Sequence, residues 1–469
     1  MPHIYIREED NTRANVTEST NVVYIPGLID NGGTLAEKTP TRFESVNAFI
    51  KAITGDALTP ISQSNVNALM AKQLISLGLP VLFESFGFST ALACEAAAAT
   101  EWSETATYYT REASTEEAGY LVDKDGFEYT IVAEPVETDL GNYFVVSVEG
   151  HNGKTADEIK SEIDWAKLSD KGLYDVKFLT AGATSTLDIA SDMVNKCASK
   201  RGDCIALIDH EQVITPSTGD TIAETVHDLF ESLVTDEETP VEVKYAAAFS
   251  PWCEFVLDGG KHVLPGSFAF LSSYGQSTKN NPNWYAAAGS TRGQIPALST
   301  SGPIYKYGDA DCLTLQGRED VNPEDGSFET NGVQTFAINP ISNIRPFGYI
   351  VWGNRTLLNN EIDGLTASSF LNIRNLCCDI KKALYAAARK YTFEQNTDIL
   401  WVNFCAAVTP LLDKALTGNG IRGYRMIQLP SGVKARLKAL VRIVPIEAVE
   451  DFDLTLELTD TLEEVSESV

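Results

Sequence analysis

The stretch Val333-Gln-Thr-Phe-Ala-Ile-Asn-Pro-Ile341 opens the part of the chain that decides the fold. Its apolar residues predict a strand over 333–338, and Tyr349-Ile-Val-Trp-Gly353 predicts a second strand. Two helices should follow, over 372–391 and 398–416. In the first helix, apolar residues recur three and four positions apart, which places them on one face. The second ends at Gly418-Asn-Gly420, a typical helix C-terminus.

Strand-like segments return after the second helix, over 423–429, 435–445 and 452–458. We therefore expect residues 333–458 to form a C-terminal α+β domain. An acidic tail, 459–469, follows it. In the segment 452–458 apolar and acidic residues alternate, which is typical of an exposed edge strand.

The charge of the chain is unevenly distributed. Residues 371–442 contain twelve Lys and Arg against four Asp and Glu, whereas 443–469 contain nine Asp and Glu and no Lys or Arg. The whole chain has a net charge of −29. A basic module within an acidic protein favours a specific acidic surface as its partner, and the simpler interpretation is a set of solvated helix faces.

The order of these C-terminal features resembles the conserved part of contractile tail sheath proteins, found in phages and in related contractile injection machines. The matching segments are Ala337-Ile-Asn-Pro-Ile341, Gly348-Tyr-Ile-Val-Trp-Gly-Asn-Arg-Thr-Leu357, the helix with Arg374, Phe393-Glu-Gln-Asn396, Trp401, Gly420-Ile-Arg-Gly-Tyr424 and a strand after Pro445. The resemblance extends back to about Lys244. No single motif is diagnostic, and the ordered set carries the resemblance.

The resemblance implies a structural subunit that polymerises helically around an inner tube and contracts to drive it through a cell envelope. It implies no cofactor. It implies as partners other copies of the chain, the tail tube protein, and baseplate and tail terminator proteins. The particle, a virion tail or related contractile device, would be assembled in a bacterial cytoplasm. The basic residues that we expect to face the tube are Lys381, Lys382, Arg389, Lys390 and Lys414.

Both ends of the chain are candidates for arms that link neighbouring subunits. A polar N-terminal arm, 1–20, contains one short alternating segment, and a short strand is stable only when it joins another sheet. The alternative is that both ends complete the chain's own sheet, and the resemblance favours exchange between subunits. The residues concerned are His3, Ile4, Tyr5 and Ile6, and Phe452, Leu454, Leu456 and Leu458.

The part before the C-terminal domain alternates strands with helices, which predicts an outer α/β domain with a parallel sheet over 21–85 and 151–332. Strands are expected near residues 21, 80, 178, 205 and 246. Residues 86–150 are predicted to form a β-rich insertion in this domain, and residues 292–331 are predicted to be loops. The fold class is thus mixed α/β and α+β, with several domains and extended terminal arms.

Composition excludes several function classes. No apolar run approaches 18 residues, which predicts no membrane insertion, and the N-terminus lacks the pattern of a signal peptide. The strong negative charge disfavours nucleic acid as a partner. The eight cysteines contain no C-x-x-C pair, and the five histidines show no metal-ligand spacing.

The one candidate for catalysis is the pair Asp209 and His210, at the carboxyl end of a predicted strand. No Gly-x-Ser-x-Gly elbow and no Walker A motif accompany it, and the simpler interpretation is a structural strand-end pair. Gly418-x-Gly420-x-x-Gly423 has the spacing of a dinucleotide-binding fingerprint. That motif follows a strand and precedes a helix, whereas this one follows a helix and precedes a strand, so we reject it. The runner-up function is therefore a cytoplasmic α/β enzyme with its site near Asp209.

Overall fold

The computed structural model describes residues 21–30, 32–88, 156–216, 219–234, 241–317, 336–358, 366–432 and 435–448, and the backbone of six strands between residues 92 and 148. The predicted arm strands at 3–6 and 452–458, and the tail 459–469, lie outside these residues.

The centre of the molecule is an eight-stranded sheet, called the main sheet here. Its order is β17-β16-β12-β11-β10-β1-β3-β2, parallel except at the two edges, where β2 and β17 run antiparallel to their neighbours. The central strands are buried on both faces, as parallel strands covered by helices must be. The strands are β1 (Val23–Ile29), β2 (Thr41–Phe43), β3 (Val81–Phe88), β10 (Phe178–Leu179), β11 (Ile205–Ile208), β12 (Ala246–Ser250), β16 (Ile338–Ile344) and β17 (Gly348–Val351).

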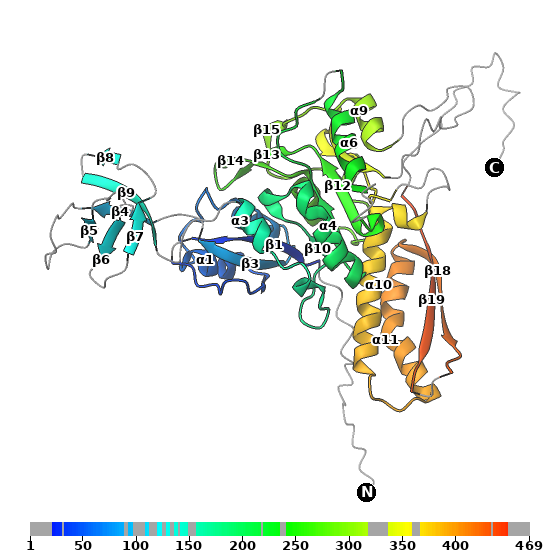
Figure 1. Cartoon of the computed structure of the whole chain (residues 1–469). Helices are drawn as coiled ribbons and strands as arrows, with labels where there is room; N and C mark the ends of the chain where they lie inside the picture. Colours follow the sequence, from blue (N-terminus) through cyan, green and yellow to red (C-terminus); the bar gives the residue numbers. More distant parts are fainter. Residues whose placement is uncertain are drawn as a thin grey trace, which may run out of the picture.

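Helices cover both faces of the main sheet (Figure 1). One face packs against α1 (Val46–Thr54), α2 (Val66–Ser76) and α7 (Gly266–Thr278). The other face packs against α3 (Ala156–Glu162), α4 (Ala190–Asp192), α6 (Ile222–Val234) and α9 (Asp309–Leu315). The mixed α/β class with a parallel sheet is therefore confirmed.

Two smaller sheets accompany the main sheet. A three-stranded antiparallel sheet is formed by β13 (Cys253–Leu257), β14 (Gly260–Leu264) and β15 (Leu298–Pro303), and the short helix α8 (Gly289–Arg292) contacts α7 and β17. The predicted insertion contains an antiparallel sheet of six strands, drawn to one side of the main sheet in Figure 1. These are β4 (Leu92–Ala96), β5 (Tyr108–Arg111), β6 (Tyr120–Asp123), β7 (Glu128–Ile131), β8 (Val136–Thr138) and β9 (Gly141–Val148).

The C-terminal unit extends away from the main sheet (Figure 1). Helices α10 (Leu371–Lys390) and α11 (Asp398–Thr417) pack against each other, and α11 also packs against a hairpin of β18 (Ile421–Leu429) and β19 (Lys438–Pro445). This hairpin is called the ribbon here. A separate core joins the three layers, with Leu376, Phe404, Val408 and Ile421 among its buried residues.

Several local expectations are wrong. Of the strand expected at 333–338, residues 333–335 lie outside the described residues, and the strand that the structure contains is Ile338–Ile344, which pairs in parallel with β12. The stretch 292–331 is not all loop, since it contains β15 and α9. The helical stretch between β10 and β11 is irregular, since it begins with a 3₁₀ turn, Leu187–Ile189, and includes a π-helical segment, Met193–Ala198.

The predicted domain boundary at residue 333 precedes two strands, β16 and β17, that complete the main sheet. The segment that stands outside the sheet begins with α10. Helix α11 is also long and apolar enough to cross a membrane by length and composition, which the search for apolar runs did not anticipate. A single such helix is weak evidence, and α11 packs against both α10 and the ribbon.

Candidate functional site

Asp209 lies just beyond β11, as predicted, but its side chain is buried and contacts other residues of the core. It is fully buried and accepts two hydrogen bonds from Ser267, from the backbone N–H at 2.7 Å and from the hydroxyl at 2.6 Å. Ser267 is in the first turn of α7, so the carboxylate fixes the start of that helix against the sheet. Burial raises the pKa of Asp209 to about 6.

His210 is also fully buried, and its imidazole contacts different partners from Asp209. Its Nε2 lies 2.8 Å from the Ser250 hydroxyl, which in turn lies 2.7 Å from the Tyr307 hydroxyl. Its Nδ1 lies 2.6 Å from the Glu211 carbonyl oxygen. Burial lowers the pKa of His210, so the ring is neutral and the network runs through hydroxyl groups.

A serine beside a histidine is the pairing that nucleophilic catalysis uses, but in the described structure both residues are buried. Asp209, His210 and Ser250 each have 0% exposure. Asp209 binds Ser267 rather than orienting the imidazole, which a catalytic triad would require. Two surface hollows, of about 500 and 360 Å³, are lined by residues of other regions, among them Tyr385 and Arg389 for one and Gln428 and Lys438 for the other.

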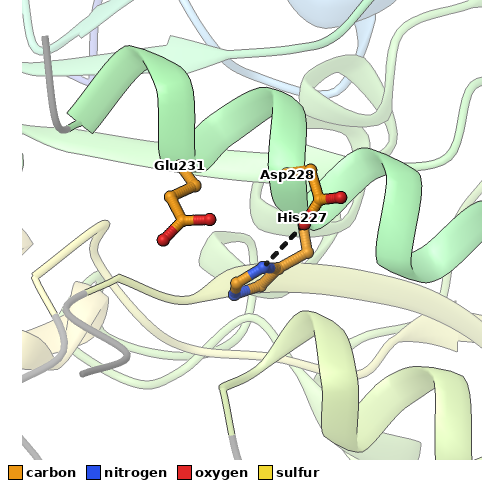
Figure 2. Close-up of side chains that lie close together, drawn as sticks. All are labelled: His227, Asp228 and Glu231. Carbon is orange, nitrogen blue, oxygen red and sulfur yellow. Dashed lines mark ion pairs between the residues drawn. The ribbon is translucent and has the colours of Figure 1, made fainter. Parts of the chain in front are cut away.

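One group of potential metal ligands lies on α6 (Figure 2). His227, Asp228 and Glu231 place one ligand atom each within 4.8 Å of the others, and His227 Nδ1 lies 3.9 Å from Asp228 Oδ1. The His227 ring stacks on Phe336 with centroids 4.4 Å apart. All three residues come from one helix, and the two acids are exposed, as acidic groups commonly are where no ion binds. These three residues of one helix therefore do not amount to a formed metal site.

The five basic residues singled out from the sequence do not gather on one surface. Lys381 Nζ donates to the Gly202 carbonyl oxygen at 2.8 Å, and Lys382 Nζ binds Asp175 at 2.5 Å, so both join α10 to the outer part of the chain. Arg389 and Lys390 are exposed in the last turn of α10. Lys414 is exposed near the end of α11, which runs antiparallel to α10.

Sequence reasoning missed the basic surface of the ribbon. Tyr424, Met426, Val441 and Ile443 pack toward α11, so the alternate residues of both strands point to the opposite face. That face carries Arg425, Lys438 and Arg442, all exposed, and Arg425 pairs directly with Arg442 across the ribbon. We call it the outer ribbon face. Two-residue alternation in 423–429 and 438–445 was the signal that could have found it.

The outer ribbon face also carries apolar side chains. Leu429 is 38% exposed and Val444 55% exposed, beside Ile427 and Leu440. Neither outer edge of the ribbon pairs with another described strand. The ribbon thus has two open strand edges and an exposed face that is both basic and apolar. Open edges and exposed apolar patches are typical of surfaces that contact another chain.

No protein-family model and no curated protein matches the sequence. Among solved structures, a chain of the PVC sheath complex, an extracellular contractile injection system in its contracted state, matches with a TM-score of 0.56 and 15% identity. The match covers 99% of this chain and 98% of that chain. This chain has the fold of a contractile injection system sheath protein.

Chains of the anti-feeding prophage baseplate are similar to the same extent. The contracted baseplate gives a TM-score of 0.54 and the six-fold symmetrised baseplate 0.53, each at 13% identity over 98% of this chain and 99% of that chain. The likeness to all three solved structures covers nearly the whole of this chain, and the resemblance inferred from the C-terminal residues is confirmed at the level of the fold.

Proposed function

We propose that the chain is the structural subunit of a contractile sheath, which polymerises helically around an inner tube and contracts to drive it through a target cell envelope. The observation that carries the proposal is the likeness of fold over 99% of the chain to a protein of a sheath complex. The buried state of Asp209 and His210 supports a structural role, because the residues most typical of catalysis are used for packing.

The proposed partners are further copies of the chain, the tail tube protein, and baseplate and terminator proteins. The particle is a virion tail or another contractile device, assembled in a bacterial cytoplasm. The matches to chains in baseplate structures support contact with a baseplate. No cofactor is required, since the work of contraction comes from a change in how subunits pack.

The ribbon offers the physical means for linking subunits. Its two open edges present unpaired backbone groups, to which an extended segment can add as a further strand. The alternating segments 3–6 and 452–458 fit that role, and the alternation of Phe452, Leu454, Leu456 and Leu458 would place four apolar side chains on one face. We propose that these segments pair with the ribbons of neighbouring copies.

The tube-facing surface is proposed to include the outer ribbon face in addition to the basic residues first considered. Arg425 and Arg442 lie directly opposite each other, an arrangement that is destabilising unless an acidic partner covers it. Among the helix residues, Arg389, Lys390 and Lys414 are exposed, whereas Lys381 and Lys382 make contacts within the chain. Exposed ion pairs contribute only about 0–1 kcal/mol each, which suits contacts that must break during contraction.

The direct test of the function is negative-stain electron microscopy of the purified chain, in high salt and after dialysis to low salt, alone and co-expressed with its tube protein. We expect hollow striated cylinders in at least one condition. Uniform small particles in every condition, including with the tube, would refute the proposal and return attention to Asp209.

The tube contact has its own test. The double substitution Arg425→Glu and Arg442→Glu should reduce sheath formation on tubes by at least tenfold, counted as sheathed tube length per micrograph. The matched control is Lys196→Glu, which changes an exposed lysine of the segment Met193–Ala198, outside the ribbon, that is ion-paired with Asp192. Equal assembly by the double variant and the control would exclude the outer ribbon face as the tube contact.

A further inference from the structure

Arg374 is a charged residue that the proposed function leaves without a role. It lies on α10 and only 6% of its surface is exposed. The centre of its guanidinium group lies 4.2 Å from the centre of the Tyr245 ring. Its Nε and Nη2 atoms are buried and have no hydrogen-bond acceptor among the described residues. The ring face attracts the charge, but a planar guanidinium directs its N–H groups in its own plane toward oxygen atoms.

Two further cations lie around the same ring. Lys381 Nζ is 5.4 Å and Lys244 Nζ is 5.5 Å from the Tyr245 centroid. Lys381 donates to the Gly202 carbonyl oxygen, and Lys244 pairs with Glu242 at 3.3 Å. Three positive charges thus surround Tyr245, and among the described residues only Glu242 is ion-paired with any of them. Lys244 is 45% exposed and Lys381 has a carbonyl acceptor, so the buried guanidinium of Arg374 is the group of this cluster that lacks acceptors among the described residues.

We propose that Arg374, with Lys244 and Lys381 beside it, binds carboxylates of the acidic C-terminal segment, residues 449–469 of this chain. That segment contains eight Asp and Glu and no Lys or Arg. A carboxylate supplies two acceptor oxygens in the geometry of the guanidinium fork, and additional acids of the segment can neutralise the two lysines.

The described chain ends close to the start of α10. The Ile446 N–H donates to the Gly420 carbonyl oxygen at 3.2 Å. In the same turn, the Gly418 carbonyl oxygen accepts a hydrogen bond from Trp284 Nε1 at 2.9 Å. The Trp284 carbonyl oxygen accepts one from Asn372 Nδ2 at 3.2 Å, two residues before Arg374. The last described residues before the acidic segment therefore lie near the end of α10 that carries Arg374.

The segment is long enough for this contact. Its 21 residues can span roughly 70 Å when extended, compared with about 30 Å for the whole of α10. Pairing of 452–458 with a ribbon, as proposed above, leaves the acids of 459–469 available. The contact can be made within one chain or between neighbouring copies, and it does not require a polymer, so its failure would leave the sheath proposal intact.

The test is zero-length crosslinking of the full-length protein with a water-soluble carbodiimide, which joins an amine and a carboxylate in contact, followed by peptide mapping. We expect Lys244 and Lys381 to be joined to acids between 450 and 467. The variant Arg374→Gln should lower that yield at least fivefold, whereas Lys390→Gln, an exposed cation of the same helix, should leave it within twofold.

A second variant keeps the test decisive if Arg374→Gln does not fold. Replacing Glu463, Glu464 and Glu467 by Gln changes only the segment and should lower the yield of the remaining crosslinks at least threefold. A mixture of ¹⁴N- and ¹⁵N-labelled chains separates contacts within a chain from contacts between copies, and either supports the proposal. Crosslinks of Lys244 and Lys381 that involve only other acids, such as Asp236 or Glu361, or no crosslinks, would overturn it.

Discussion

The buried ion pair of Lys177 and Asp379 gives the strongest prediction about stability. Lys177 Nζ lies 2.8 Å from Asp379 Oδ1, with the side chains 0% and 4% exposed. Asn283 Nδ2 donates to Asp379 Oδ2 at 2.6 Å, and Lys177 Nζ also donates to the Asn21 amide oxygen at 2.9 Å. The pair joins the main sheet to α10 in a place where neither charge reaches water.

Asp379→Asn should destabilise the fold strongly, because it leaves the Lys177 ammonium buried with only the neutral Asn21 oxygen as a known partner. Removing one member of a buried pair costs about 3–5 kcal/mol. At roughly 2–4 °C per kcal/mol for a cooperative unit of 150–250 residues, the thermal midpoint should fall by about 6–20 °C. Circular dichroism of the unpolymerised protein, at fixed concentration, measures this midpoint.

The control is Asp192→Asn, which removes the acid of the exposed pair Lys196–Asp192, with side chains 52% and 50% exposed. That change should cost at most about 0.5 kcal/mol. The double variant Lys177→Met and Asp379→Leu should lose less stability than Asp379→Asn, since no unpaired charge stays buried. Equal midpoints for Asp379→Asn and Asp192→Asn would refute the reasoning.

Two further predictions concern single buried groups. Burial raises the pKa of Asp209 from 3.8 to about 6, so the stability that its protonated form provides is complete below pH 3.8 and is lost as the pH rises through 6. The free energy of unfolding of Asp209→Asn should therefore rise relative to that of the natural protein as the pH increases from about 4 to 7, by up to about 3 kcal/mol, and a constant difference across this range would contradict the assignment. Gly420→Ala should cost about 1–3 kcal/mol in denaturant titrations followed by tryptophan fluorescence, because its Cβ would lie 2.8 Å from the Trp284 ring, whereas a Cβ at Gly423 meets nothing within 4 Å and serves as control.

The long elements were predictable because their signals are local. The two C-terminal helices were expected at 372–391 and 398–416 and occur at Leu371–Lys390 and Asp398–Thr417. Their three-and-four spacing and the glycines after the second helix fix both type and extent. The alternation of strands and helices in the parallel sheet was predictable for the same reason, because buried strands form short apolar runs between helices.

The strand Ile338–Ile344 was misplaced because its pairing is not local. Its sequence, Ile-Asn-Pro-Ile-Ser-Asn-Ile, contains a proline and two asparagines, which disfavour a strand. The fold compensates through tertiary contacts: Asn339 Nδ2 donates to the carbonyl oxygens of Ala248 and Arg355, and its Oδ1 accepts from the Arg355 N–H. Such partners lie far away in the sequence, so local propensity gives no sign of them.

The basic surfaces were also only partly predictable from the sequence, because exposure depends on tertiary contacts. Charge counting found the basic C-terminal module, but not that Lys381 and Lys382 bind Gly202 and Asp175. Whether a lysine on an amphipathic helix meets solvent or a carbonyl oxygen depends on what packs beside it. In contrast, the outer ribbon face follows from strand alternation once the ribbon is known to cover α11 on one side.

The position of Asn21 determines how the fold would bear a mechanical load. Its amide oxygen accepts hydrogen bonds from Lys177 Nζ and from the Tyr274 hydroxyl, each at 2.9 Å. The strand that follows, β1, lies between β10 and β3 and runs parallel to both. A pull on the chain before Asn21, directed along β1, would load both ladders of hydrogen bonds in shear, so that many bonds must break together. The same anchor passes tension through Lys177 to α10, and the sheet and the C-terminal helices would then move under force as one body.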